Sequence, residues 1–229
     1  MNINVPVSQK PTGLCFIMNY FGSDKGDPEC AKRHTYTRMY YPLFEPVRDR
    51  PLRIFEIGLG TNNPQFPSNM GVDGKPGASL RGWKQFFPQA HIFGADIDSG
   101  ILFQEDRIRT FFCDQGSPDS IRALWSQPEL AESMDIIIDD AYHVFDYNVT
   151  FFENSCHKLA EGGIFIVEDI MYYTLDAWRE KIALWEQQYP SFSFRLCVIP
   201  HELNSDDNTM LIVQNAGDQG PPARPLLPV

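Results

Sequence analysis

The stretch IFEIGLG, residues 54–60, decides the fold, because a short apolar run leads directly into a glycine turn. A buried strand followed by such a turn lets the backbone approach a ligand closely. Taken alone, the pattern fits a plain strand-to-loop turn equally well. Asn63 stands where the dinucleotide fingerprint has its third glycine, so the sequence disfavours a nicotinamide-dependent enzyme.

Short apolar runs alternate with helical patterns along the chain. The apolar runs span 52–57, 91–95, 109–113, 134–138 and 163–167, and the helical patterns span 36–47, 78–87, 117–127 and 146–159. This alternation predicts a parallel sheet covered by helices on both faces. After a helix at 175–188, strands at 192–199 and 209–214 lie close in sequence, which favours an antiparallel hairpin. The predicted fold is a doubly wound, Rossmann-like α/β sheet, mostly parallel, with an antiparallel terminal hairpin.

The composition limits the class of protein and its partners. The chain has 229 residues, of which 43% are hydrophobic, and this suits one globular domain with short extensions. A formal net charge of −11 repels phosphate backbones, so nucleic acid is not an expected partner. Five scattered cysteines without a C-x-x-C pair indicate reduced thiols in a cytoplasmic protein. We expect no signal peptide and no membrane span, because the apolar run 14–18 is too short.

Three regions are expected along the chain. Residues 1–50 form an N-terminal arm, whose turn-rich segment 24–36 is a candidate lid or else part of a helix that packs on the sheet. Residues 51–216 form the main domain, and 217–229 form a flexible tail rich in glycine and proline. The long loop 62–77 interrupts the first strand-to-helix turn, where doubly wound folds bind ligands, so a functional loop is expected.

Acidic residues stand at the ends of the second and third predicted strands. Asp96 directly follows an apolar run, a place where a carboxylate accepts both ribose hydroxyls of a nucleoside. Asp98, two residues later, suits a helix cap instead. Asp114 ends the third strand and can accept the exocyclic amine of adenine, or simply form a turn. With the turn at Gly58 and Gly60, these positions predict a nucleoside site at the carboxyl edge of the sheet.

A second acidic cluster follows the fourth and fifth strands. Asp140 ends one strand, and Glu168 and Asp169 end the next. The two strands are neighbours in this fold, about 4.8 Å apart, so the three carboxylates should converge. Clustered carboxylates repel one another unless a cation compensates them, and oxygen ligands suit Mg²⁺, Mn²⁺ or Ca²⁺. The alternative is a set of caps and turn residues on a rim that faces water.

A histidine accompanies this acidic cluster. His143 lies three residues after Asp140, near the start of the next helix. A histidine whose pKa is near neutral, beside a metal-bound hydroxyl, is suited to act as a general base. The alternative is a histidine at a helix start that bonds a neighbouring backbone group.

These motifs resemble those of class I, S-adenosylmethionine-dependent sugar O-methyltransferases. The likeness is to the mycinamicin-type macrolide enzymes and to relatives in bacterial surface-polysaccharide gene sets, and it runs from about Phe21 to about Tyr173. The motifs are GSDK at 22–25 with His34 and Tyr36, EIG at 56–58, GASLR at 77–81, FGADI at 93–97, DD at 139–140 with His143, and VED at 167–169. Five parallel strands and a terminal hairpin are also the class I methyltransferase order. Tyr142, in place of a small residue, and the loop 62–77 depart from the macrolide enzymes.

The resemblance implies a cofactor, a metal and a set of site residues. S-adenosylmethionine would be bound by Glu56, Gly58, Gly60, Ser79, Asp96, Asp114 and Asp139, and Mg²⁺ or Mn²⁺ by Asp140, Glu168 and Asp169. His143 would act as the base. The candidate acceptor contacts are Asp24, Lys25, His34, Tyr36 and Tyr142. The expected acceptor is a small molecule or glycan with neighbouring hydroxyls, and self-association of the chain is left open.

Two other functions remain open from the sequence. A catechol-type O-methyltransferase shares the fold and the metal, but its acceptor needs a flat apolar slot rather than polar side chains and stacking rings. A nucleoside-binding protein without transferase activity would bind the cofactor without turning over any diol. An iron-dependent oxygenase is disfavoured, because the usual two-histidine, one-carboxylate triad is not evident.

Overall fold

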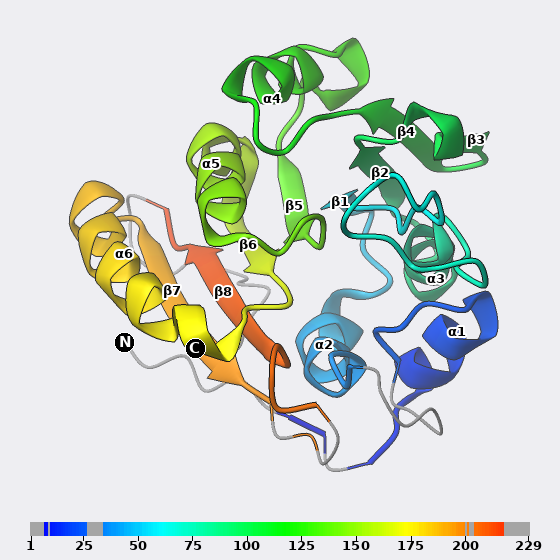
Figure 1. Ribbon diagram of the computed structural model, residues 1–229, viewed down its shortest axis with the longest axis horizontal. Helices are drawn as coiled ribbons and strands as arrows, with labels where there is room; N and C mark the ends of the chain where they lie inside the picture. Colours follow the sequence, from blue (N-terminus) through cyan, green and yellow to red (C-terminus); the bar gives the residue numbers. More distant parts are fainter. Residues whose placement is uncertain (1–6, 9, 27–33, 200, 202–203, 218–229) are drawn as a thin grey trace.

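One sheet of eight strands, with helices on both faces, organises the molecule (Figure 1). The computed structural model describes residues 7–8, 10–26, 34–199, 201 and 204–217. The strands lie in the order β3-β4-β2-β1-β5-β6-β8-β7. The two parallel halves of this sheet therefore meet at β1, which pairs with β2 on one side and β5 on the other.

The parallel part of the sheet confirms the prediction from the apolar runs. Its strands are β1 (Arg53–Ile57), β2 (His91–Asp96), β4 (Ile108–Phe112), β5 (Met134–Asp139) and β6 (Leu159–Val167). The terminal strands β7 (Phe192–Val198) and β8 (Thr209–Asn215) pair antiparallel, and β8 also pairs antiparallel with β6. The two-residue edge strand β3 (Gln104–Glu105) was not predicted, because it is too short to show a period.

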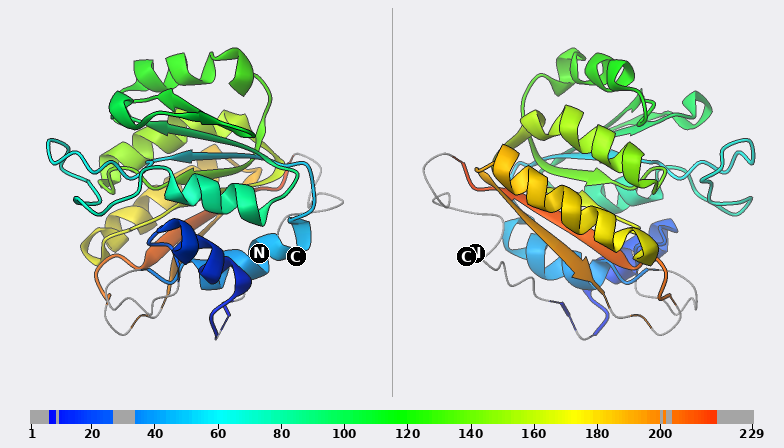
Figure 2. Two further views of the ribbon diagram at one scale, coloured as in Figure 1. Left: turned by 90° about the vertical axis from the view of Figure 1, so that its right-hand side faces the viewer. Right: turned by 60° about the vertical axis from the view of Figure 1, so that its left-hand side comes forward.

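The helices divide between the two faces of the sheet (Figure 2). On one face lie α1 (Gly13–Phe21), α2 (Thr37–Phe44) and α3 (Ala78–Phe86), and on the other α4 (Pro118–Trp125), α5 (Phe145–Ser155) and α6 (Leu175–Gln188). Short 3₁₀ turns occur at Glu45–Val47, Ser99–Ile101, Pro128–Leu130, Cys156–Lys158 and Tyr172–Thr174. The helix α1 was not predicted, although Thr12 caps its first turn and Gly22 ends it with φ of 88°. In the described residues, no helix is long and apolar enough to cross a membrane.

Alternate residues of each central strand enter two separate cores. Ile54 of β1 packs with the helices α1–α3, whereas its neighbour Phe55 packs with α4–α6. In β5, Ile136 and Ile138 face the first core and Ile137 the second. Because successive strand side chains point to opposite faces, a continuous apolar run is what a sheet covered on both sides requires.

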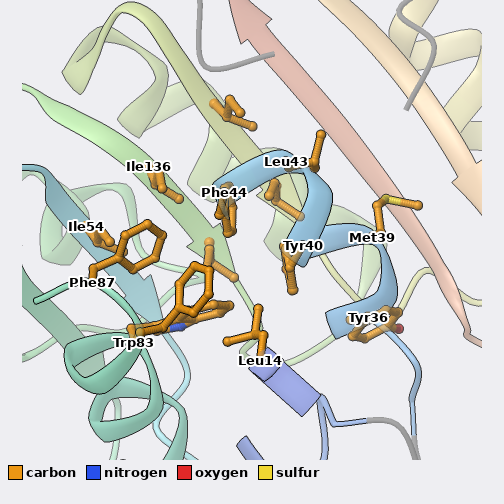
Figure 3. Packing of buried hydrophobic residues seen from close by; sticks show 14 of the residues in the cluster. Leu14, Tyr36, Met39, Tyr40, Leu43, Phe44, Ile54, Trp83, Phe87 and Ile136 are labelled. Carbon is orange, nitrogen blue, oxygen red and sulfur yellow. The ribbon is translucent and has the colours of Figure 1, made fainter. Parts of the chain in front are cut away.

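The N-terminal helices belong to the first core (Figure 3). Tyr40 and Phe44 of α2 are fully buried, and both rings lie against Trp83 of α3. Pro42 lies inside α2, as the sequence indicated. The described part of the predicted arm 1–50 therefore packs on the sheet, and the candidate lid 24–36 stays a prediction, with 27–33 outside the described residues. Residues 218–229 of the predicted tail and Cys30 also lie outside them.

Candidate active site

A cleft opens at the carboxyl edge of the parallel strands, where doubly wound folds bind ligands. Its volume is about 430 Å³, within the range of sites for small molecules. The loops after β1, β2, β4, β5 and β6 each contribute to its lining. The residues concerned are Gly58, Gly60, Asp96, Ile97, Asp114, Gln115, Asp140, Tyr142, His143 and Asp169.

The glycine turn after β1 forms the floor of the cleft. Gly58 has φ of 94°, and a side chain there would overlap the carbonyl oxygen of Asp140. Gly60 has φ of 75°, and a Cβ there would lie 3.0 Å from Met70 Cγ. Only glycine therefore lets the β1 turn pass this close to the loop after β5.

Asp96 joins the β1 turn to the end of β2. Its carboxylate accepts the backbone N–H of Leu59 at 2.7 Å and that of Asp98 at 2.8 Å. Burial raises the pKa of Asp96 above its ordinary value. Asp98 accepts the N–H of Gly100 at 2.9 Å and the hydroxyl of Thr61 at 2.6 Å, so it is the cap that the sequence allowed. Asp96, not Asp98, lines the cleft.

Asp139 is buried and does not line the cleft, and its assignment to the cofactor stays a prediction. Its carboxylate accepts hydrogen bonds from Gln115 Nε2 at 2.6 Å and from Asn148 Nδ2 at 3.0 Å. Gln115 in turn accepts the backbone N–H of Tyr142 at 3.1 Å. Burial raises the pKa of Asp139 to about 6. The adjacent residue in the chain, Asp140, faces the cleft.

Glu56 is likewise buried beneath the β1 turn and not exposed in the cleft. It accepts the hydroxyl of Ser79, and Trp83 Nε1 donates to it at 2.6 Å. These bonds fix α3 against β1, so Glu56 supports the site without facing it. Ser79 does line a smaller cavity that adjoins the cleft, although its hydroxyl is directed at Glu56.

Asp140, His143 and Asp169 converge at one end of the cleft. One ligand atom from each lies within 4.8 Å of the others, and His143 Nε2 is 3.5 Å from Asp169 Oδ2. His143 and Asp169 have φ of 58° and 55°, a left-handed backbone that side chains other than glycine rarely adopt. His143 Nδ1 is buried and has no hydrogen-bond partner among the described residues. Arg107 has the same φ of 58° in a turn away from the cleft, so the unpaired imidazole nitrogen is the stronger sign of a functional site here.

Glu168 does not line the cleft, and its role as a metal ligand beside Asp140 and Asp169 stays a prediction. Lys25 Nζ lies 2.5 Å from Glu168 Oε2 and also pairs with Asp140, while the hydroxyl of Tyr40 donates to Glu168 Oε1. Lys25 is 1% exposed. Burial lowers the pKa of Lys25, but Asp140 and Glu168 outweigh that effect and hold the net pKa well above its ordinary value.

Tyr36 holds Asp169 in place through hydrogen bonds of its hydroxyl group. Its hydroxyl donates to Asp169 Oδ1 and accepts the backbone N–H of Asp169 at 3.2 Å. His34 stacks on Tyr36 with ring centroids 4.6 Å apart, and its Nδ1 lies 3.4 Å from Asp169 Oδ1. Tyr36 and Lys25 are each 1% exposed and bond carboxylates, so their role as acceptor contacts stays a prediction. Two of the candidate acceptor contacts, Asp24 and Tyr142, line the cleft in the described part of the chain, and the other three do not.

The long loop after β1 forms one wall of the cleft. Its residues 66–70 line the cleft, and the hydroxyl of Ser68 donates to the carbonyl of Ala141 at 3.2 Å. Tyr147 of α5 lines the opposite side and meets the ring of Tyr142 edge-on, with centroids 4.9 Å apart. The sequence indicated a functional loop here but not which of its residues face the cleft.

No protein-family model matches the chain, but several curated proteins are similar to it in sequence. It is 35% identical over 158 residues to the 8-demethyl-8-α-L-rhamnosyl tetracenomycin-C 2′-O-methyltransferase of Streptomyces olivaceus. It is 31% identical over 164 residues to the mycinamicin VI 2″-O-methyltransferase of Micromonospora griseorubida. This chain is related to the sugar O-methyltransferases. The matches cover 69% and 71% of this chain but only 38% and 37% of the two relatives.

A solved methyltransferase has the same fold. The MycE methyltransferase of the mycinamycin pathway, in complex with Mg, SAH and mycinamycin VI, superposes with a TM-score of 0.66 at 24% identity. The match covers 95% of this chain and 58% of that one. This likeness confirms the predicted methyltransferase sheet with its antiparallel hairpin.

Proposed function

We propose that this sugar O-methyltransferase relative transfers a methyl group from S-adenosylmethionine to a sugar hydroxyl, with a divalent cation at Asp140 and Asp169. The observation that carries the proposal is the meeting of Asp140, His143 and Asp169 at the end of the cleft that Gly58 and Asp96 also line. Relatives that methylate sugars of natural products support the reaction class. The SAH and Mg named with MycE support the cofactor and the metal.

The nucleoside part of the cofactor fits the end of the cleft formed by β2 and β4. Each oxygen of Asp96 accepts one backbone N–H, and a carboxylate can accept about four hydrogen bonds, so the ribose hydroxyls still find acceptors. Asp114 lines the cleft beyond β4 and can accept the adenine amine. When bound, the cofactor supplies an electrophilic methyl group on a sulfonium.

The charges at the other end of the cleft fit a divalent cation. Lys25 pairs with three carboxylates, those of Glu56, Asp140 and Glu168, and Asp169 lies beside Asp140, so acids outnumber the lysine at this end of the cleft. A divalent cation would offset part of the remaining negative charge, with carboxylate oxygens as ligands that Mg²⁺ or Mn²⁺ prefers. When bound, such a cation supplies positive charge that lowers the pKa of an acceptor hydroxyl.

His143 is the proposed general base. Burial lowers its pKa, but Asp169 and Asp140 outweigh that effect, so the net pKa lies above the ordinary value for histidine. Asp169 orients the ring through Nε2, and the ring lines the cleft where an acceptor must bind. In its neutral form, His143 would take the proton of the acceptor hydroxyl as that oxygen bonds to the methyl carbon, the methyl–sulfur bond would break, and S-adenosylhomocysteine would leave. The cleft would align the two reactants.

The test is methyl transfer to a panel of glycosides with neighbouring hydroxyls, compared with a panel of catechols. His143→Ala should lower turnover by about 10²–10⁴-fold, the usual scale for loss of a general base, and leave Mn²⁺ affinity nearly unchanged. His91→Ala is the matched control, because His91 is exposed at the start of β2. Loss of Mn²⁺ binding in His143→Ala would make the histidine a ligand instead. Turnover of catechols alone, or cofactor binding without any turnover, would refute the sugar assignment.

A further inference from the structure

A small cavity adjoins the main cleft between the β1 turn and the start of α3. Its volume is about 30 Å³, enough for a few ligand atoms rather than a whole ligand. It shares Gly58, Gly60 and Asp140 with the main cleft, so the two are continuous. Its outer wall comes from the N-terminal segment 22–24 and from Lys75 of the long loop.

Lys75 is the only lysine or arginine that lines either cavity within the described residues. Its ammonium makes no ion pair or hydrogen bond with any described side chain. The lysine stem lies over Gly22, since a Cβ on that glycine would be 2.8 Å from Lys75 Cδ and 3.4 Å from Nζ. The nearby Lys25 is buried and already paired with three carboxylates. Lys75 is therefore an exposed lysine without an ion-pair partner among the described residues, at the rim of a cleft that carboxylates also line.

The start of α3 adds to this positive charge. The helix begins at Ala78, and both Ala78 and Ser79 line the small cavity. The first backbone N–H groups of a helix lack partners within the helix and carry a partial positive charge. The N–H of Ala78 already donates to the carbonyl of Lys75 at 3.0 Å, so the helix start offers an anion its partial positive charge, and Lys75 is the charged partner.

Apart from Lys75 and His143, the charged side chains that line the two cavities within the described residues are carboxylates. Asp24 and Asp140 line the small cavity as well as the cleft, and Asp96, Asp114 and Asp169 line the cleft alone. S-adenosylmethionine carries two positive groups, its sulfonium and its α-ammonium, and a single negative group, its α-carboxylate. The many acids and the one lysine therefore match the charges of this cofactor.

Strand order fixes which end of the cofactor reaches the small cavity. Asp96 and Asp114 follow β2 and β4, on one side of β1, and take the nucleoside in the proposed function. Asp140 and Asp169 follow β5 and β6, on the other side, where the acceptor must bind. The amino-acid end is left with the space over the β1 turn. We propose that Lys75 binds the α-carboxylate of the cofactor there, with Asp24 placed to accept the α-ammonium. This inference rests on the proposed function.

The test compares two ligands by calorimetry, without any turnover. S-adenosylhomocysteine carries the amino-acid end, and methylthioadenosine has the same nucleoside without it. Lys75→Gln should lower the affinity for S-adenosylhomocysteine about 10- to 100-fold, the scale for a hydrogen bond between charged groups. The affinity for methylthioadenosine should change by less than about twofold. Lys84→Gln is the matched control, because Lys84 lies on α3 outside both cavities and pairs only with Asp106, at 3.7 Å.

The outcomes separate failure of the Lys75 assignment from failure of the proposed function. Equal binding of S-adenosylhomocysteine by Lys75→Gln and the unchanged protein would overturn the role of Lys75 while the proposed function stands. A parallel loss of methylthioadenosine binding would show that Lys75 only supports the loop, and would also overturn it. If the unchanged protein binds neither ligand, the proposed function itself fails.

Discussion

Tyr36→Phe isolates the hydroxyl that holds Asp169 in place. The substitution keeps the ring and its packing against His34, and removes one donor to Asp169 Oδ1 and one acceptor for the Asp169 N–H. Burial, followed by the charge of Asp169, raises the pKa of Tyr36 well above its ordinary value, so the hydroxyl is a donor at any working pH. A hydrogen bond to a charged group is worth roughly 1.5–3 kcal/mol, and we expect a loss of unfolding free energy on that scale.

The substitution should weaken metal binding at one end of the cleft and leave nucleoside binding at the other end unchanged. Asp169 adopts a left-handed backbone, and Tyr36 bonds both its carboxylate and its N–H. Loss of groups that orient metal ligands typically costs about 10–100-fold in metal affinity. We therefore expect Tyr36→Phe to lower the affinity for Mn²⁺ by at least about tenfold. S-adenosylhomocysteine affinity should stay unchanged, because Asp96 follows β2 on the other side of β1.

Urea denaturation and Mn²⁺ calorimetry measure both effects. Tyr20→Phe is the control, because Tyr20 is 81% exposed and loses the same atom without consequence for the site. Unchanged Mn²⁺ affinity together with lower stability would show that Tyr36 is only a structural residue. Equal losses of Mn²⁺ and cofactor affinity would point to general loosening of the fold and would also refute the reasoning.

Three further perturbations test other parts of the site. Asp96→Ala should weaken S-adenosylhomocysteine by about 1–3 kcal/mol in calorimetry, and unchanged affinity would exclude Asp96 as a ribose ligand. Hydrogen exchange with and without S-adenosylhomocysteine should show added protection within 22–40 if this segment is a lid, and no change would leave it a fixed part of the core. Burial raises the pKa of Cys113 to about 12, so alkylation of this cleft residue should be slow at neutral pH and quicken with each unit of rising pH; fast alkylation at neutral pH would contradict that burial.

The sequence predicts the sheet well because its signals are local. The apolar runs IFEI at 54–57 and III at 136–138 are properties of neighbouring residues, and both became central strands. The strand ends then place Asp96, Asp114, Asp140 and Asp169 at one edge without further information. Helix α1 could also have been found, from the cap at Thr12 and the glycine at its end.

The supporting contacts could not be predicted, because they join distant parts of the chain. Lys25 is 143 residues from Glu168, and Tyr36 is 133 residues from Asp169. The motifs flagged Lys25 and Tyr36 as polar groups for an acceptor, since neither residue type is usually fully buried. Sequence alone also cannot decide which of two adjacent acids faces a ligand. Asp139 turned inward to Gln115 and Asn148, whereas Asp140 faces the cleft.

The most direct test of metal-dependent sugar methylation follows a labelled methyl group. The protein is incubated with methyl-labelled S-adenosylmethionine and a glycoside that has neighbouring hydroxyls, with Mg²⁺ or with a strong chelator. We expect labelled glycoside with Mg²⁺, none with chelator, and recovery when Mg²⁺ or Mn²⁺ is added in excess, while S-adenosylhomocysteine affinity stays nearly constant. Full labelling of a verified acceptor in chelator would contradict the metal site at Asp140 and Asp169.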